Sequence, residues 1–214
     1  RKACDASLKR LNRDYIDLLQ FHLNPYHTDK APAVRDTLEE LVEAGKIRAY
    51  GWSTDAPERA RIFAEGEHCT SVQFQMNVLN DNPEMRELCQ RERIAGINRG
   101  PLAMGLLTGK YDTKGITDPN DVRGPNSPEW MKYFVRGKPS EEFLEKVAAI
   151  RDILTADGRS LVQGALGWLL ARSEMLVPIP GFKSVKQVEE NAGTLQRGAL
   201  TEAQLREIDT LLDR

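Results

Sequence analysis

The sequence has few of the features that mark secreted, metal-binding or membrane-spanning proteins. Its 214 residues include only three cysteines, Cys4, Cys69 and Cys89, which are widely spaced and form no CxxC pair. An odd number of isolated cysteines favours reduced thiols in a cytoplasmic protein over disulfides or a zinc site, and we expect no metal. The apolar runs are far too short to cross a bilayer and no signal peptide is recognisable, so we expect no membrane association.

An excess of charge of one sign is also missing. The 30 Lys and Arg residues nearly balance the 32 Asp and Glu residues, which gives a formal net charge of -2. This balance does not suggest a nucleic-acid or membrane-surface partner, and we expect neither. With 40% hydrophobic and 29% charged residues, the composition is that of a soluble globular protein, and it leaves the oligomeric state open.

Short apolar segments alternate with amphipathic ones along most of the chain. The alternation predicts strands over residues 15–21, 47–52, 71–76, 94–98 and 176–179. Helices are predicted over 32–44, 56–64, 83–90, 140–154, 161–172 and 201–212, and a further one after Ser184. Repeated βα units indicate a parallel sheet. Five such units do not close an eight-stranded barrel and could instead form an open doubly wound sheet, so both architectures stay open at this point.

Residues 99–139 interrupt this alternation and predict a long irregular loop over the site. The segment is rich in Gly, Pro and Asp, and it also contains Trp130, Tyr133 and Phe134. An irregular stretch of this length inside a domain is usually functional. Its aromatic residues fit two roles, covering a ligand or covering the core.

Polar residues follow the predicted strands, and the ligand site of a parallel α/β sheet lies at that edge. His22 is the titratable residue that directly ends an apolar strand, so it is a candidate for polarising a carbonyl or moving a proton. A purely structural histidine is the alternative. Ser53, Gln73 and Lys183 stand near other strand ends, and this set of groups suits an anionic ligand that bears an amide.

Two segments predict phosphate binding. After the apolar residues 176–179 come Pro180 and Gly181, and Ser184 then stands at a helix N-cap with Gln187 as its capping-box partner. Free backbone N–H groups at the helix start, flanked by lysines, would attract phosphate, although an ordinary capped helix is the alternative. Residues 100–110 form a glycine-spaced loop whose backbone could approach a pyrophosphate, but Tyr111 after Lys110 rules out a Walker loop.

Four segments in this order resemble the aldo-keto reductase family: DYIDLLQFH at 14–22, GKIRAYGWS at 45–53, and residues 100–111 and 179–191. The resemblance implies a (β/α)8 TIM barrel that uses NADPH to reduce a small carbonyl substrate by hydride transfer. It also implies that residues 1–214 form a single, incomplete barrel domain holding strands 4–8 and their helices. The missing strands 1–3 would carry the catalytic Asp, Tyr and Lys, so the chain alone is expected to be inactive.

The resemblance assigns roles to individual residues. His22 would orient the substrate carbonyl, and Ser53 and Gln73 would bind the nicotinamide carboxamide. The pyrophosphate loop would comprise Arg99, Gly100, Pro101, Leu102, Gly105, Leu107 and Lys110, with Arg123 as a further contact. The adenosine half would be held by Gly181, Phe182, Lys183, Ser184, Gln187, Glu190 and Asn191.

The chain departs from the family pattern at three of these places. Thr54 follows Ser53 where many members have Asn, Arg99 replaces a nicotinamide-stacking Tyr, and Gln187 replaces an Arg. NADP is still predicted over NAD, because Lys183 is available for a 2′-phosphate.

The substrate and the biological role are less constrained. By position, Trp52, Trp130, Tyr133 and Phe134 could form a substrate wall, with core packing as the alternative role. Two alternative functions are a cofactor-binding regulatory subunit, as in potassium channels, and an inactive truncated pseudo-enzyme.

Overall fold

The computed structural model describes residues 1–111 and 115–214 of the chain. Its internal contacts separate two compact units. Unit 1 comprises residues 1–74, 82–97 and 175–177, and unit 2 comprises residues 75–81, 98–174 and 178–214. Most of the parallel sheet lies in unit 1, whereas unit 2 contains most of the later helices.

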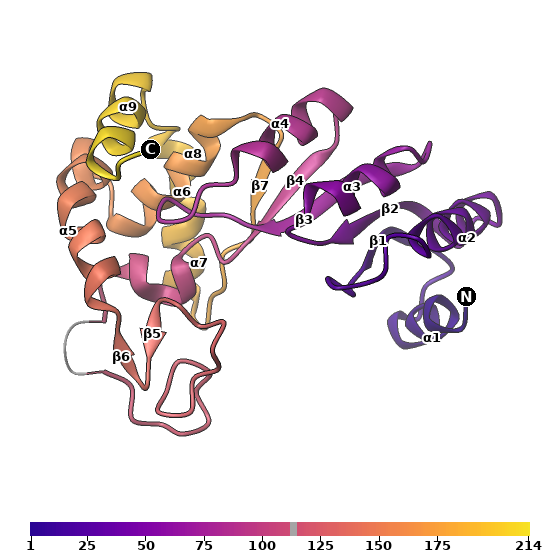
Figure 1. Ribbon diagram of the computed structural model, residues 1–214, viewed down its shortest axis with the longest axis horizontal. Coiled ribbons are helices and arrows are strands. Elements are labelled where there is room, and N and C mark those ends of the chain that lie inside the picture. The colour runs from indigo at the N-terminus through magenta and orange to yellow at the C-terminus, as the bar shows by residue number, and fades with distance from the viewer. Residues whose placement is uncertain (112–114) are drawn as a thin grey trace. The chain divides into compact units, whose positions relative to one another are not determined.

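Strands and helices alternate in unit 1 (Figure 1). The strands are β1 (Ile16–Phe21), β2 (Ile47–Ser53), β3 (Cys69–Gln75), β4 (Ala95–Arg99) and β7 (Leu176–Pro178). The helices are α1 (Lys2–Leu11), α2 (Ala31–Glu43), α3 (Pro57–Ala64) and α4 (Pro83–Glu92). Pro follows the N-cap closely in α2, α3 and α4, where its missing N–H costs no intrahelical bond. These strand bounds confirm all five predicted strands, with small shifts at their ends.

The strand order decides between the two architectures that the sequence left open. The sheet runs β1-β2-β3-β4-β7, so neighbouring strands follow one another in chain order, and β2 pairs in parallel with both β1 and β3. A doubly wound sheet reverses its strand order at a switch point, and this sheet has no reversal. An order without reversal is the one that a βα barrel requires.

Aromatic side chains fill the core of unit 1. Tyr50 and Trp52 of β2 are fully buried beside Phe63 of α3, and the ring centroids of Trp52 and Phe63 are 4.7 Å apart. Cys69 and Cys89 are free and buried, and burial raises the pKa of each thiol to about 12. Both thiols therefore stay protonated at neutral pH.

Unit 2 is mainly helical. It contains η1 (Ala103–Thr108), the antiparallel pair β5 (Phe134–Val135) and β6 (Lys138–Pro139), α5 (Glu141–Thr155), η2 (Ala156–Gly158) and α6 (Leu161–Arg172). These are followed by α7 (Val185–Ala192), α8 (Thr194–Arg197) and α9 (Glu202–Leu211). The segment 99–139, predicted as a long irregular loop over the site, contains the short helix η1 and the β5–β6 hairpin, and its place over the site stays a prediction. Residues 112–114 of that segment are outside the described residues.

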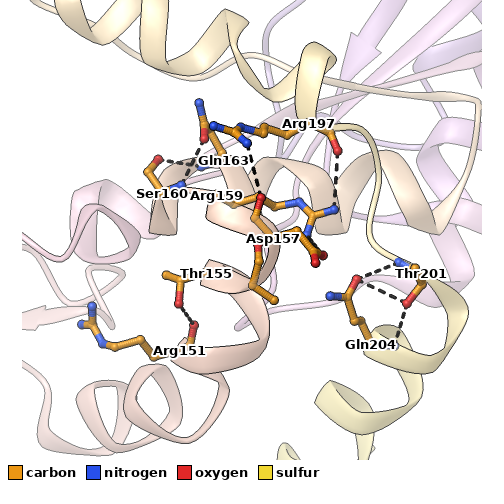
Figure 2. Close-up of polar contacts among 10 residues, drawn as sticks. Arg151, Thr155, Asp157, Arg159, Ser160, Gln163, Arg197, Thr201 and Gln204 are labelled. Atoms are coloured by element: carbon orange, nitrogen blue, oxygen red, sulfur yellow. Dashed lines mark hydrogen bonds and ion pairs between the residues drawn. The ribbon is translucent and has the colours of Figure 1, made fainter.

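Side-chain hydrogen bonds fix the helix ends of unit 2 (Figure 2). Ser160 with Gln163 and Thr201 with Gln204 form complete capping boxes, the latter as predicted. Arg159, whose side chain is only 6% exposed, donates to Asp157 at 2.9 Å and to the carbonyl of Arg197 at 3.5 Å. This arginine therefore ties the η2 turn to the end of α8.

Candidate cofactor and catalytic site

In unit 1, the loop that carries His22 is held by its neighbours. His22 follows β1 and is exposed. The indole Nε1 of Trp52 donates to the carbonyl of Leu23 at 3.0 Å, and Arg59 Nη1 donates to the carbonyl of Asn24 at 2.8 Å. These bonds fix the backbone immediately after His22, although nothing restrains the imidazole itself among the contacts of the described residues.

Ser53, the last residue of β2, is the register partner of Gln73, which lies two residues before the end of β3. Ser53 is 3% exposed, and Gln73 is partly exposed. The backbone N–H of Thr54 donates to the carbonyl of Gln73 at 2.9 Å, and the Thr54 hydroxyl accepts from the N–H of Ala56 at 3.3 Å. Thr54, which replaces the Asn of many relatives, is thus buried and bonded to the turn that leads into α3.

In unit 2, the predicted pyrophosphate loop forms the short helix η1 in an unusual backbone conformation. Ala103, Met104 and Gly105 have φ angles of 48°, 56° and 96°. For the two non-glycine residues this left-handed conformation costs on the order of 1 to 3 kcal/mol each, and such strain is concentrated at functional sites. The buried side chains of Leu102 and Leu107 anchor the loop, so these two residues can face a ligand only through their backbone.

Arg123 holds this loop from one side. Its Nη1 donates to the carbonyl of Met104 at 3.0 Å and to the hydroxyl of Tyr111 at 2.7 Å, while Nε and Nη2 donate to Asp121. These hydrogen bonds hold the pKa of Asp121 well below its usual range, and the charge of Lys183 acts in the same direction. Arg123 therefore braces η1, and its predicted contact with the cofactor stays a prediction.

Asn77 is a site residue whose role the sequence did not predict. Its Nδ2 donates both to the carbonyl of Gly100 and to the hydroxyl of Tyr133, each at 2.9 Å. Asn77 and Tyr133 are both buried, and burial raises the pKa of Tyr133. The pair fixes the turn that enters the pyrophosphate loop. The only sequence signal for this role is a polar residue just after β3.

The start of α7 is open to solvent. Ser184 caps the helix by accepting from the N–H of Gln187 at 3.3 Å. The predicted capping box is not closed, because Gln187 Oε1 accepts from the N–H of Lys183 at 2.6 Å rather than from Ser184. Nothing lies within 4 Å of the position a Cβ would take at Gly181, and Phe182 is 63% exposed. Exposed backbone and side chains therefore coincide with the helix start here.

The end of α7 offers a hydrogen-bond donor with no partner. Gln163 Nε2 of α6 donates to the carbonyl of Glu190 at 3.3 Å, and this hydrogen bond joins α7 to α6. Asn191 Nδ2 is buried and has no hydrogen-bond partner among the described residues. A buried donor without an acceptor carries a free-energy cost, which a ligand acceptor would remove.

Three of the four predicted substrate-wall residues pack in the core instead. Trp52 and Phe134 are 0% exposed and Tyr133 is 1% exposed, because each is enclosed by neighbouring aromatic rings. Trp130 alone of the four is accessible, with 65% exposure. Core packing, the alternative role named for these aromatics, therefore applies to Trp52, Tyr133 and Phe134.

The described part of the chain contains neither a cluster of metal-binding side chains nor a helix that could span a membrane. Within residues 1–111 and 115–214, no group of three or more His, Cys, Asp or Glu residues is placed to hold a metal ion. Among the helices of the same residues, none combines the length and apolar character that crossing a membrane requires.

The parallel sheet in chain order defines a barrel-type α/β protein. In unit 2, the exposed, capped start of α7 is a candidate phosphate site. The chain belongs to the Aldo/keto reductase family, which it matches over residues 1–213. It is 34% identical over 218 residues to the aldo-keto reductase yakc [NADP(+)] of Schizosaccharomyces pombe, covering 99% of this chain and 62% of that protein. An L-glyceraldehyde 3-phosphate reductase of Escherichia coli O157:H7 is 29% identical, covering 96% and 60%.

Solved structures give the same result. The glycerol dehydrogenase of Gluconobacter oxydans superposes with a TM-score of 0.81 at 26% identity, over 100% of this chain and 63% of that one. An aldo-keto reductase of Bacillus halodurans in its holo form gives a TM-score of 0.73 at 27% identity, over 98% and 65%. The chain thus spans about three fifths of the length of the curated relatives that it matches.

Proposed function

We propose that this chain is part of an NADP(H)-dependent aldo-keto reductase that reduces a carbonyl compound by hydride transfer. Strands β1 to β4 and β7 would be strands 4–8 of one eight-stranded barrel domain. Two observations support this: the sheet runs in chain order without a switch point, and the chain matches only 52–66% of the length of its relatives.

The exposed start of α7 is the observation that carries the proposal. Gly181 leaves the backbone open, Ser184 satisfies only one of the first N–H groups of α7, and Lys183 adds positive charge. Such a helix start binds phosphate well. Phe182 offers an exposed ring face for stacking, and the orphaned Asn191 Nδ2 is a donor that suits a ring nitrogen of adenine. The residues present therefore fit the adenosine 2′-phosphate half of NADP(H).

The remaining cofactor residues fit in the same way. The strained, braced backbone of η1 would lie along the pyrophosphate, with Lys110 beside it, and Arg99 would stack through its guanidinium plane. Ser53 and Gln73 would bind the carboxamide of the nicotinamide. NADPH, when bound, supplies the hydride.

His22 would orient the substrate carbonyl through its imidazole N–H. We propose that the proton donor and its partners lie in the part of the relatives that this chain does not cover. The chain by itself should therefore show no carbonyl-dependent oxidation of NADPH. Measurable turnover of a model aldehyde by the purified chain would contradict this placement of the catalytic groups.

Cofactor binding can be tested directly by fluorescence titration of the chain with NADPH and NADH. NADPH should bind more tightly, and Lys183→Met should weaken NADPH binding roughly tenfold while leaving NADH nearly unchanged, because a charged contact to phosphate is lost. Lys9→Met, an exposed lysine on α1, is the matched control and should change neither affinity. Equal affinities of the unmodified chain for NADPH and NADH would refute the assignment of the 2′-phosphate to Lys183.

A further inference from the structure

In unit 1, one row of residues crosses three strands two positions before the predicted carboxamide residues Ser53 and Gln73. Gln20 of β1 is the register partner of Gly51 of β2, and Gly51 is the partner of Ser71 of β3. The Gln20 side chain spans this row, and its Nε2 donates to Ser71 Oγ at 2.7 Å. A side chain of the first strand therefore bonds to the third strand and passes over the second.

Gly51 is required for this crossing. A Cβ at position 51 would lie 2.8 Å from Gln20 Nε2 and 2.4 Å from both the carbonyl oxygen and Oγ of Ser71. No side chain larger than hydrogen fits between the partners. The register of β2 and β3 also shifts between Tyr50 and Gly51, and this shift places Ser71 opposite Gly51. Such irregularities re-aim side chains and are frequent beside active sites.

Stability does not account for the presence of Gln20. Its Oε1 is buried and accepts no hydrogen bond among the described residues, and a buried unsatisfied acceptor costs free energy. A leucine of similar size would fill the space without that cost. Places where a sequence gives up local stability are commonly functional.

The next residues on the same face of the strands are those proposed to bind the nicotinamide carboxamide. Side chains two positions apart on a strand share a face, so Ser53 and Gln73 form the row directly after Gly51 and Ser71, and they are themselves register partners. β1 lies at the end of the strand order, and among the described residues its other strand pairing is with β2. The Gln20–Ser71 bond thus adds a second tie to the strand that His22 follows.

We infer that Gln20 is a positioning residue, which crosses Gly51 to Ser71 and thereby fixes β1 and β3 so that His22, Ser53 and Gln73 face one nicotinamide ring. This inference rests on the proposed function. It concerns the nicotinamide half of the site alone, because the proposed adenosine site at residues 181–191 belongs to unit 2.

The test compares NADPH with 2′,5′-ADP, which lacks the nicotinamide half. Gln20→Leu, Ser71→Ala and the double variant should each weaken NADPH binding roughly fivefold, the value of one hydrogen bond, and leave 2′,5′-ADP binding unchanged. The double variant should be no weaker than either single variant, because the two residues act through one bond. Gln196→Leu, an exposed glutamine of α8, is the matched control.

Thermal unfolding of the same variants separates positioning from general destabilisation. The double variant should unfold at the temperature of the parent chain or above it, since it leaves neither partner unsatisfied and removes the unsatisfied Oε1 of Gln20. Unchanged NADPH binding in all three variants would overturn the inference, and so would a parallel loss of both ligands with a lower unfolding temperature. If the parent chain binds neither ligand, the proposed function itself fails and the inference falls with it. If the parent chain binds NADPH and the variants bind it equally well, only the inference fails.

Discussion

Replacement of Gly164 by alanine sets two known effects against each other. Gly164 lies in the interior of α6 and is buried. Helix propensity alone predicts that Gly164→Ala stabilises the protein by about 0.5 to 1 kcal/mol. The packing of α6 against α5 predicts the opposite result.

The geometry indicates which effect is larger. A Cβ at position 164 would lie 2.0 Å from the carbonyl oxygen of Leu154 and 2.6 Å from its carbonyl carbon. The first distance is about 1.4 Å short of the 3.4 Å at which ordinary van der Waals contact begins. Both atoms belong to the backbone at the buried end of α5, so no rotamer change relieves the contact. Overpacking of this kind costs about 1 to 3 kcal/mol, occasionally more, and exceeds the propensity gain.

Gly167 of the same helix provides the matched control. Its Cβ would meet a methyl group of Leu200 at 2.9 Å, the end of a flexible side chain, although the carbonyl oxygen of Gly198 lies at 3.2 Å. Both variants gain the same helix propensity, so their difference measures the backbone approach. We expect Gly164→Ala to lower the free energy of unfolding by about 2 kcal/mol, and Gly167→Ala to change it by less than about 1 kcal/mol.

Urea unfolding followed by circular dichroism measures both values. The expected loss corresponds to a decrease of about 4 to 8 °C in Tm for a chain of this size. A Gly164→Ala variant as stable as the parent chain, or more stable, would refute the close approach of α5 and α6.

Two further predictions concern charged groups. In unit 1, the hydrogen bond with Glu39 raises the pKa of His68, so its contribution to stability is complete below the unfolded value of 6.5 and is lost as the pH rises through the folded value. Because the pair is partly exposed, His68→Gln should lower the free energy of unfolding by about 0.5 kcal/mol near pH 6 and by almost nothing near pH 8.5. Urea titrations at the two pH values measure this, and an equal loss at both would contradict it. In unit 2, Arg123→Lys keeps the charge but loses the planar guanidinium that donates to Met104 and Tyr111. It should lower the free energy of unfolding by about 1 to 2 kcal/mol in the same assay. An unchanged value would show that these two hydrogen bonds do not stabilise the loop.

Much of the secondary structure follows from short-range patterns. The alternation of apolar strands and amphipathic helices placed all five strands of the main sheet, and the pairing of Thr201 with Gln204 located a complete capping box. These features depend on neighbours within a few residues, so the local sequence is enough to specify them. The short elements η1, β5, β6, η2 and α8 were missed, because elements of this length depend on packing more than on periodicity.

The candidate site could be predicted only in part. Family motifs assign the residues at the strand ends, and their cofactor contacts stay predictions; at α7, Phe182 is exposed and Asn191 Nδ2 has no hydrogen-bond partner among the described residues. The side-chain roles of Trp52 and Arg123 could not be predicted. An aromatic or cationic residue near a strand end looks the same in the sequence whether it faces a ligand or its own core.

The sequence by itself thus determined the family, the order of the βα units and the residue types available at each strand end. The tertiary structure alone decided that the strands follow chain order without a switch point, that Gln187 bonds to Lys183 rather than closing a capping box, and that Gln20 reaches Ser71 over Gly51. The physical reason is distance along the chain. Gln20 and Ser71 are 51 residues apart, and only the register of three strands brings their side chains within hydrogen-bonding distance.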